Sequence, residues 1–295
     1  MRIFVTGAAG FIGQAVTAEL IGHGHDVLGL ARNDANAAIL EAAGAAVHRG
    51  DLNDADSLIA GVRQADAVIH LAFIHDFAKF QQNIETDNAV VTAMIEALGG
   101  SDKPFIGTSG TLMLPPGRLG TEQDRPGSRG GGVSRGDTEL VVTGASGVRG
   151  AVVRLSPSVH SQADKHGFVP MLIKIAREKG HAAYIGDGAN RWSAVHQLDA
   201  ARLYRLAVER TPGGKTYHGV GEEGVAFRDI ATVISEGLDL PVRSIAAEEA
   251  PGYFGWMAGF AGSDNPASNA ITREALGWEP THPGLLDDMR AHYFG

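Results

Sequence analysis

A glycine pattern within the first thirteen residues restricts the possible folds more than any other feature of the sequence. The apolar run from Ile3 to Val5 leads through Thr6 into Gly-Ala-Ala-Gly-Phe-Ile-Gly, and a helical pattern follows from Phe11 to Ile21. A short strand, a glycine turn and a helix in this order predict the first half of a nucleotide-binding βαβ unit. The chain should therefore contain a parallel sheet whose first strand ends in a phosphate-binding turn.

The three glycines of this turn, Gly7, Gly10 and Gly13, have separate predicted roles. Gly7 allows the tight turn after the strand, Gly10 lets the backbone approach a diphosphate group, and Gly13 lets the helix pack closely on the sheet. The free N–H groups and the dipole at the start of the helix favour a bound anion. The turn therefore indicates a dinucleotide site.

The first half of the chain alternates strand and helix patterns, which predicts an α/β fold: a Rossmann-type, doubly wound parallel sheet with helices on both faces. After Ile3–Val5, the expected strands are His25–Leu30, Ala46–Leu52, Ala67–Ala72, Pro104–Ser109 and Ala151–Leu155. After the first helix, the expected helices are Ala35–Ala43, Asp54–Val62 with Asp54 as N-cap, Asp76–Leu98, and one that starts within Asp137–Thr143.

From Ser156 the alternation is less regular, and we expect a domain boundary at residue 155. Residues 1–155 would form the dinucleotide-binding domain, and residues 156–295 a smaller substrate lobe with segments that return to the main sheet. The expected lobe helices are Phe168–Lys179, Leu198–Glu209, Phe227–Gly237, Gly252–Phe260 and Leu285–Tyr293, and the expected strands are Ala183–Gly186, Thr216–Gly219 and Val242–Ile245.

Composition excludes several classes of protein. The 295 residues carry a net charge of -9, which argues against nucleic acid as a partner. Cysteine is absent, so thiol catalysis, disulfides and thiolate metal sites are excluded, and the histidine spacing predicts no metal site. No apolar run approaches the ~20 residues of a membrane span. No signal segment precedes the first strand, and we expect a cytoplasmic location without membrane partners.

The turn after Thr6 resembles the T-G-x-x-G-x-x-G motif of the short-chain dehydrogenase/reductase superfamily, in particular its extended members, which are similar to NAD-dependent epimerases and dehydratases. Similar segments occur along nearly the whole chain. They are His70-Leu-Ala-Phe73, Asn88, Arg154-Leu-Ser-Pro-Ser-Val-His160 and Glu274-Ala-Leu-Gly-Trp-Glu-Pro280. The resemblance implies hydride transfer between a nicotinamide cofactor and a small carbonyl or alcohol substrate.

The resemblance also implies which residues contact the cofactor. In the first motif and at the ends of the later strands they are Thr6, Gly7, Ala9, Gly10, Phe11, Ile12, Gly13, Leu71, Ala72, Phe73, Thr108, Ser109, Arg135, Ser156 and Val159. His70 is either part of this site or a core histidine, and Asn88 is expected to be structural. Asn190, Arg191 and Trp192 either border the substrate or, for Trp192, belong to the core of the lobe.

Residues after the second and third strands distinguish NAD from NADP. No carboxylate stands at the end of the second strand to bind the ribose 2′-hydroxyl of NAD, and Arg32 offers donors suited to a 2′-phosphate. This pattern favours NADP(H) over NAD(H), although Asp34 is nearby and Arg32 could simply be an exposed loop residue. Asp51 could accept a hydrogen bond from the adenine amino group, with Leu52 beside the ring; a turn or capping role is the alternative.

The expected catalytic residues depart from the family pattern. Ser109 fits the serine that follows the fifth strand, but the Y-x-x-x-K pair is missing. Arg135 takes the lysine position, four residues before Glu139, and Gly131 stands where the tyrosine should be. Ser109 and Arg135 could polarise a substrate oxygen. An arginine side chain stays protonated at working pH, so it cannot deliver the proton.

The proton donor must therefore be sought elsewhere. His75 follows the fourth strand at the carboxyl edge of the sheet, where ligands bind in such folds, so it is the first catalytic histidine to test. His160, His196 and water are the alternatives.

Three functions are consistent with this sequence. The first is an atypical NADP-dependent oxidoreductase. The second is an NADP(H)-binding sensor or regulator without turnover, which the missing tyrosine favours. The third is an epimerase or dehydratase that recycles its cofactor, which normally requires a competent acid–base pair. A homodimer is expected, because the helices Asp76–Leu98 and the one near Asp137 pair in dimers of this superfamily.

Overall fold

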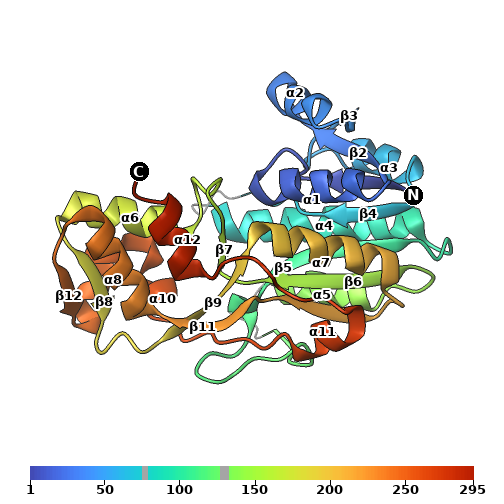
Figure 1. The fold of residues 1–295 in the computed structure, drawn as a ribbon. Helices are drawn as coiled ribbons and strands as arrows, with labels where there is room; N and C mark the ends of the chain where they lie inside the picture. Colours follow the sequence, from blue (N-terminus) through green and yellow to red (C-terminus); the bar gives the residue numbers. More distant parts are fainter. Residues whose placement is uncertain (75–78, 127–132) are drawn as a thin grey trace.

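The computed structural model describes residues 1–74, 79–126 and 133–295, which form a large sheet flanked by helices and a smaller second lobe (Figure 1). The predicted Rossmann-type fold is confirmed by a parallel seven-stranded sheet of order β10-β6-β5-β4-β1-β2-β3. Its strands are β1 (Arg2–Thr6), β2 (Asp26–Ala31), β3 (Ala46–Arg49), β4 (Ala67–His70), β5 (Pro104–Gly110), β6 (Arg149–Leu155) and β10 (Lys215–Gly219).

Helices cover both faces of this sheet, which is why its central strands are almost wholly apolar. One face packs against α1 (Phe11–Gly22), α2 (Asp34–Ala42) and α7 (Gln197–Arg210). The other packs against α3 (Ala55–Arg63), α4 (Phe80–Leu98) and α5 (Arg135–Thr143). Within the described ranges, none of the helices has both the length and the apolar character needed to cross a bilayer.

The strand order reverses between β1 and β4. From β1 the chain builds outward through β2 and β3, and from β4 it builds in the opposite direction through β5 and β6. Ligands of open α/β sheets bind at the carboxyl ends of the strands, beside such a switch point. In Figure 1 these carboxyl ends face the second lobe.

The second lobe contains two small sheets. One has the order β11-β9-β7 and joins β7 (Ser158–His160), β9 (Arg191–His196) and β11 (Glu222–Ala226); the other pairs β8 (Ala182–Ile185) with β12 (Val242–Ile245). The lobe core combines α6 (Phe168–Lys179), α8 (Phe227–Leu238), α9 (Ala250–Phe254), α10 (Ala258–Ala261) and α12 (Leu285–His292). Another helix, α11 (Ala270–Leu276), packs against α7 and β10.

Several lobe elements differ from the sequence expectation. The helix expected over Gly252–Phe260 is interrupted, because Gly255 adopts a φ of +57° that an α-helix cannot contain. A short 3-10 helix, η4 (Gly255–Met257), therefore separates α9 from α10. Two further 3-10 turns are η2 (Thr111–Met113) and η3 (Ala247–Glu249). The strands β7, β9 and β11 and the helix α11 were not predicted. The domain boundary at residue 155 stays a prediction.

Candidate functional site

The glycine turn leaves the start of α1 open to an anion. Gly7 has a φ of +70°, and a Cβ there would lie 2.8 Å from the Ala72 amide nitrogen. A Cβ on Gly13 would lie 2.0 Å from the Gly7 carbonyl oxygen, so only glycine allows this close packing. Gly10 is the exposed N-cap of α1, which has no side-chain cap and no acidic residue in its first turn. The free N–H groups therefore suit a diphosphate.

The end of β4 lies directly against this turn. The Leu71 amide donates to the Thr6 carbonyl oxygen at 3.2 Å, and the Ala72 amide donates to Thr6 Oγ1 at 3.3 Å. Leu71, Ala72 and Phe73 are each partly exposed at the carboxyl edge of the sheet. The other motif residues, Ala9, Phe11 and Ile12, are also partly exposed there. The glycine turn and the end of β4 therefore lie side by side at the carboxyl edge of the sheet.

The ends of β2 and β3 carry two arginines. Arg32 is exposed directly after β2, and Arg49 ends β3, where it pairs in register with Ala31. Arg49 forms an ion pair of 2.7 Å with Asp34, so the carboxylate near Arg32 has a cationic partner of its own. This edge of the sheet therefore presents two guanidinium groups and one paired carboxylate.

Asp51 adopts the turn geometry that was the alternative to adenine binding. Its Oδ1 accepts hydrogen bonds from the Asn53 amide at 2.8 Å and from Asn53 Nδ2 at 2.7 Å. Leu52 is half-buried and packs against the core formed by α3, α4 and α5. The capping role of Asp54 is confirmed, since its side chain accepts from the Ser57 amide at the start of α3.

Ser109 and Arg135 come together at the carboxyl end of β5. Ser109 is 5% exposed, and its hydroxyl has no hydrogen-bond partner among the residues that the structure describes. Arg135 is the first residue of α5; its Nη2 donates to the Thr108 carbonyl oxygen at 2.8 Å, and its guanidinium lies 4.2 Å from the centre of the Phe73 ring. A buried hydroxyl without a partner is costly, so a ligand atom is its natural complement.

A tyrosine from a distant element reaches the same strand end. Tyr204 on α7 is fully buried, and its hydroxyl lies 2.8 Å from Thr108 Oγ1, which donates to the His70 carbonyl oxygen at 2.7 Å. Burial raises the pKa of Tyr204, against smaller opposing effects of Thr108 and the Arg135 charge. Tyr204 is therefore favoured as a neutral side chain, whose hydroxyl donates a hydrogen bond to Thr108 Oγ1. No local sequence pattern indicates this contact, since the two residues are far apart in the chain.

A buried ion pair fixes the helix that carries Arg135. Arg154 on β6 donates to both carboxylate oxygens of Glu139 on α5, with a shortest contact of 2.6 Å. Arg154 also donates to His218 Nε2 at 3.4 Å, while His218 Nδ1 donates to the Ser268 carbonyl oxygen at 2.8 Å. Burial lowers the pKa of His218, which favours the neutral ring. Asn88 adds a second link, from Nδ2 to Thr138 Oγ1 on α5 at 3.3 Å.

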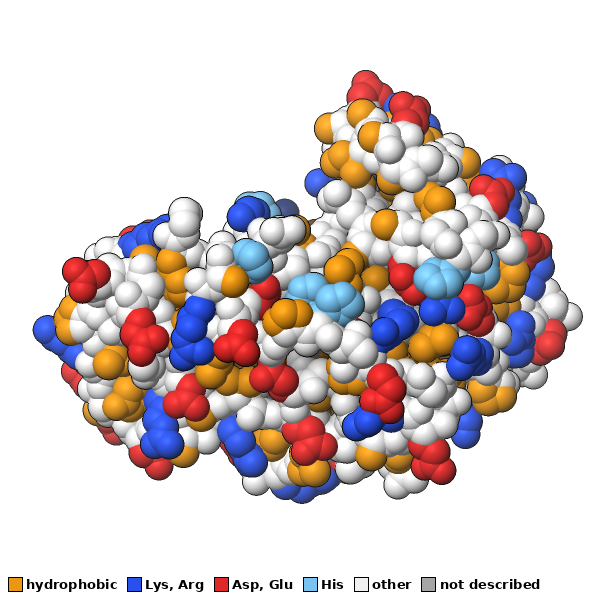
Figure 2. Space-filling model, in the orientation of Figure 1, with side chains coloured by type: hydrophobic (Ala, Val, Ile, Leu, Met, Phe, Trp, Pro, Cys, Tyr) orange, Lys and Arg blue, Asp and Glu red, His pale blue; other side chains and the backbone are white. Residues whose placement is uncertain are grey.

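The segment after β6 borders the same edge. The Ser156 hydroxyl donates to the Gly219 carbonyl oxygen at 3.0 Å, and Val159 is half-buried against the main core. Two short strands then bring His160 and His196 together, with ring centres 5.4 Å apart. Figure 2 shows histidine side chains gathered on the face between the two lobes, near a hollow in the molecular outline.

The two described histidine candidates have structural partners. His160 is 1% exposed, and its Nδ1 lies 2.8 Å from Asp288 on α12. His196 caps α7, because its Nδ1 accepts from the Leu198 amide at 3.2 Å. Burial lowers the pKa of His196, and the nearby His160 and His282 lower it further. The preferred catalytic histidine, His75, lies outside the described residues.

The described contacts of Asn190, Arg191 and Trp192 all hold the second lobe together. Trp192 is fully buried in the lobe core, which was the second of the two interpretations for it. Arg191 forms an ion pair of 2.9 Å with Asp264, and Asn190 Nδ2 donates to the carbonyl oxygens of Ala261 and Ser263.

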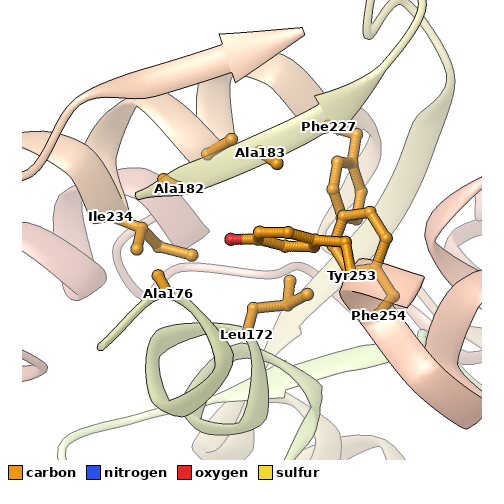
Figure 3. Close-up of a pocket in the computed structure, with 9 residues that line it drawn as sticks. Leu172, Ala176, Ala182, Ala183, Phe227, Ile234, Tyr253 and Phe254 are labelled. Carbon is orange, nitrogen blue, oxygen red and sulfur yellow. The ribbon is translucent and has the colours of Figure 1, made fainter. Parts of the chain in front are cut away.

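The cavities in the described part of the chain include two small ones. The one in Figure 3 is apolar, lies between α6, β8, α8 and α9, and holds about 10 Å³, with Tyr253 and Phe254 beside it. That volume admits about one water molecule, so the cavity is no substrate site. The other is equally small, polar, and lies under Arg135. No cluster of metal-ligating side chains occurs among residues 1–74, 79–126 and 133–295.

Comparison with known proteins agrees with this geometry. Residues 3–127 match the model of the NAD dependent epimerase/dehydratase family. The chain is 46% identical to uncharacterized protein YLL056C of Saccharomyces cerevisiae, over 99% of both chains. It is 28% identical to a 2-alkyl-3-oxoalkanoate reductase of Stenotrophomonas maltophilia, over 83% of this chain and 73% of that protein.

The fold is also similar to solved structures. The dTDP-glucose 4,6-dehydratase DesIV of Streptomyces venezuelae, with NAD and TYD bound, superposes with a TM-score of 0.77 at 20% identity, covering 99% of this chain and 95% of that chain. The fold, the glycine turn and the sequence relatives lead to one assignment: this chain belongs to the NAD dependent epimerase/dehydratase family, the extended short-chain dehydrogenases/reductases.

Proposed function

We propose that this protein is an NADP-dependent reductase of a small carbonyl compound. The observation that carries the proposal is the buried Ser109 hydroxyl without a described partner, at the strand end where Arg135 is anchored. The 28% identical 2-alkyl-3-oxoalkanoate reductase, whose name denotes reduction of an oxo group, supports the same class of reaction. The substrate itself stays open.

The proposed roles follow from the contacts. Ser109 donates a hydrogen bond to the substrate oxygen, and Arg135 stabilises the negative charge that develops there. Arg135 is suited to this because only its Nη2 bonds to Thr108, and its other nitrogens make no hydrogen bond within the described residues. When bound, the nicotinamide cofactor supplies the hydride. The proton that completes the alcohol comes from water or from His75, the first histidine to test.

We also propose that the cofactor is NADP(H) rather than NAD(H). Arg32 and Arg49 stand at the ends of β2 and β3, where the proposed cofactor would place its adenosine ribose, and both can donate to a 2′-phosphate. The ion pair between Arg49 and Asp34 is exposed, with Asp34 98% accessible, so a phosphate can replace the carboxylate at little cost. Arg32→Ala and Arg49→Ala should each weaken NADPH binding about tenfold or more and leave NADH binding unchanged.

The test of turnover is NADPH oxidation with a panel of ketones, aldehydes and sugar nucleotides. Ser109→Ala should lower kcat strongly while the Kd for NADPH stays within about twofold. Binding of NADPH with no turnover on any substrate would instead favour the second candidate, a cofactor-dependent sensor, which the absence of tyrosine before Tyr184 favours. Epimerase or dehydratase activity on sugar nucleotides is the third outcome. The homodimer and the cytoplasmic location stay predictions.

A further inference from the structure

A buried carboxylate beneath the proposed cofactor site has no role in the mechanism above. Asp87 lies within α4 and is 7% exposed, and its Oδ1 is 3.2 Å from Nε2 of His70, which is 3% exposed. Both side chains line the small polar cavity under Arg135. Burying a carboxylate is unfavourable unless it is paired, so its contact with His70 must offset a real cost.

The hydrogen bonds of His70 define which of its nitrogens carries the proton. A carboxylate only accepts, so Nε2 donates to Asp87. On the other side, Nδ1 lies 2.8 Å from Thr6 Oγ1, which already accepts from the Ala72 amide. If Nδ1 were protonated, the Thr6 hydroxyl hydrogen would have no acceptor within the described part of the chain. The neutral Nε2–H form therefore satisfies every proton in this chain of contacts.

This chain of contacts connects three elements of the proposed cofactor site. It begins on α4 at Asp87, passes through His70 at the end of β4, and reaches Thr6 at the end of β1. From Thr6 it returns to the Ala72 amide, in the segment that packs against Gly7. The His70 ring thus adds a side-chain link between the glycine turn and the end of β4, beside the backbone hydrogen bond from Leu71 to Thr6.

We infer that Asp87 is a positioning residue for the cofactor, because it holds His70 in the Nε2–H form. In this form His70 keeps Thr6 bonded to both His70 and Ala72. These bonds help to keep the ends of β1 and β4 in the arrangement that binds the cofactor. This inference rests on the proposed function. Asp87 does not touch the cofactor. It acts through His70 and Thr6 alone, and its required property is the ability to accept a hydrogen bond.

The experiment compares Asp87→Asn, which retains an accepting oxygen, with Asp87→Leu, which does not. Asp87→Asn should bind NADPH within about threefold of the original chain, and Asp87→Leu should bind it roughly tenfold more weakly, the effect of about one lost hydrogen bond. Glu96→Gln, at an exposed position of the same helix, is the matched control and should change nothing. Binding is measured by NADPH fluorescence, and folding by thermal unfolding without cofactor.

Two further measurements separate positioning from general stability. Nitrogen-15 NMR of the original chain should show His70 protonated at Nε2 and not at Nδ1. Thr6→Val should weaken NADPH binding to a similar degree, and the double variant with Asp87→Leu should be little worse than either single one, because both remove the same chain of contacts. The NMR result can overturn the inference even if Asp87→Leu fails to fold.

The inference would be overturned by a proton on Nδ1 of His70, by unchanged NADPH affinity in folded Asp87→Leu, or by additive losses in the double variant. Failure of the proposed function looks different, since the original chain itself would then bind no NADP(H). The inference would also be overturned if Asp87→Asn lost NADPH affinity tenfold, as much as Asp87→Leu. The charge of Asp87, and not its hydrogen bond, would then matter.

Discussion

Replacing Gly10 with alanine should weaken cofactor binding while leaving the protein folded. A Cβ at this position would meet the Gly7 carbonyl oxygen at 3.2 Å as its only neighbour within 4 Å, and the backbone φ of -78° is open to any residue. The added methyl group would project from the exposed N-cap of α1, toward the proposed diphosphate. Gly13 is different, because a Cβ there would overlap the backbone at 2.0 Å and prevent folding.

The size of each effect can be worked from these contacts. Alanine in place of glycine at an N-cap costs at most about 1 kcal/mol, which corresponds to a fall in Tm of about 2–4 °C for a chain of this size. A diphosphate displaced by one methyl group loses at least one charge-assisted hydrogen bond, worth about 1.5–3 kcal/mol. The Kd for NADPH should therefore rise roughly ten- to hundredfold.

The assay is titration calorimetry with NADPH, alongside thermal unfolding of the cofactor-free protein. Gly22→Ala is the matched control, because Gly22 ends the same helix and a Cβ there meets nothing within 4 Å. It should keep the original affinity. If Gly10→Ala is folded and binds NADPH as tightly as the original chain, the diphosphate does not lie at this turn and the argument for the site is wrong.

The remaining predictions concern stability. The fold lowers the pKa of His196 from 6.5, so the folded state favours the neutral ring. The contribution of His196 to stability is therefore full above that pH and falls as acid protonates this cap of α7. His196→Asn replaces the histidine with a cap that does not titrate, and in urea unfolding it should remove about 1 kcal/mol of this acid sensitivity. The control His166→Asn, at an exposed position, should not. Equal acid profiles for the two variants would refute the capping role of His196. Glu139→Gln should cost about 3–5 kcal/mol by leaving the buried Arg154 charge unpaired, and a loss below about 1 kcal/mol in the same assay would contradict this. Asp239→Gly should raise stability by about 0.5–1 kcal/mol, because Asp239 directly follows α8 as its C-cap with a φ of +52°. A lower Tm of the variant would argue against strain at this position.

Local patterns were sufficient to predict the large sheet and its cofactor-binding turn. The alternation of apolar strands and helices is encoded in neighbouring residues, and Gly7, Gly10 and Gly13 lie within seven positions of one another. Three of the strands of the second lobe were missed for the opposite reason. β7, β9 and β11 are only three to six residues long and are held by pairing between distant segments. Short runs of this kind carry no periodic signal of their own.

The sequence by itself determined the fold class, the glycine turn and the absence of the tyrosine–lysine pair, because each is a property of residues close together in the chain. Only the tertiary structure decided which side chains meet. Tyr204 reaches Thr108, Arg154 pairs with Glu139, and Asp87 reaches Thr6 through His70. These contacts depend on how helices pack across the sheet, and packing of distant segments leaves no mark on local spacing.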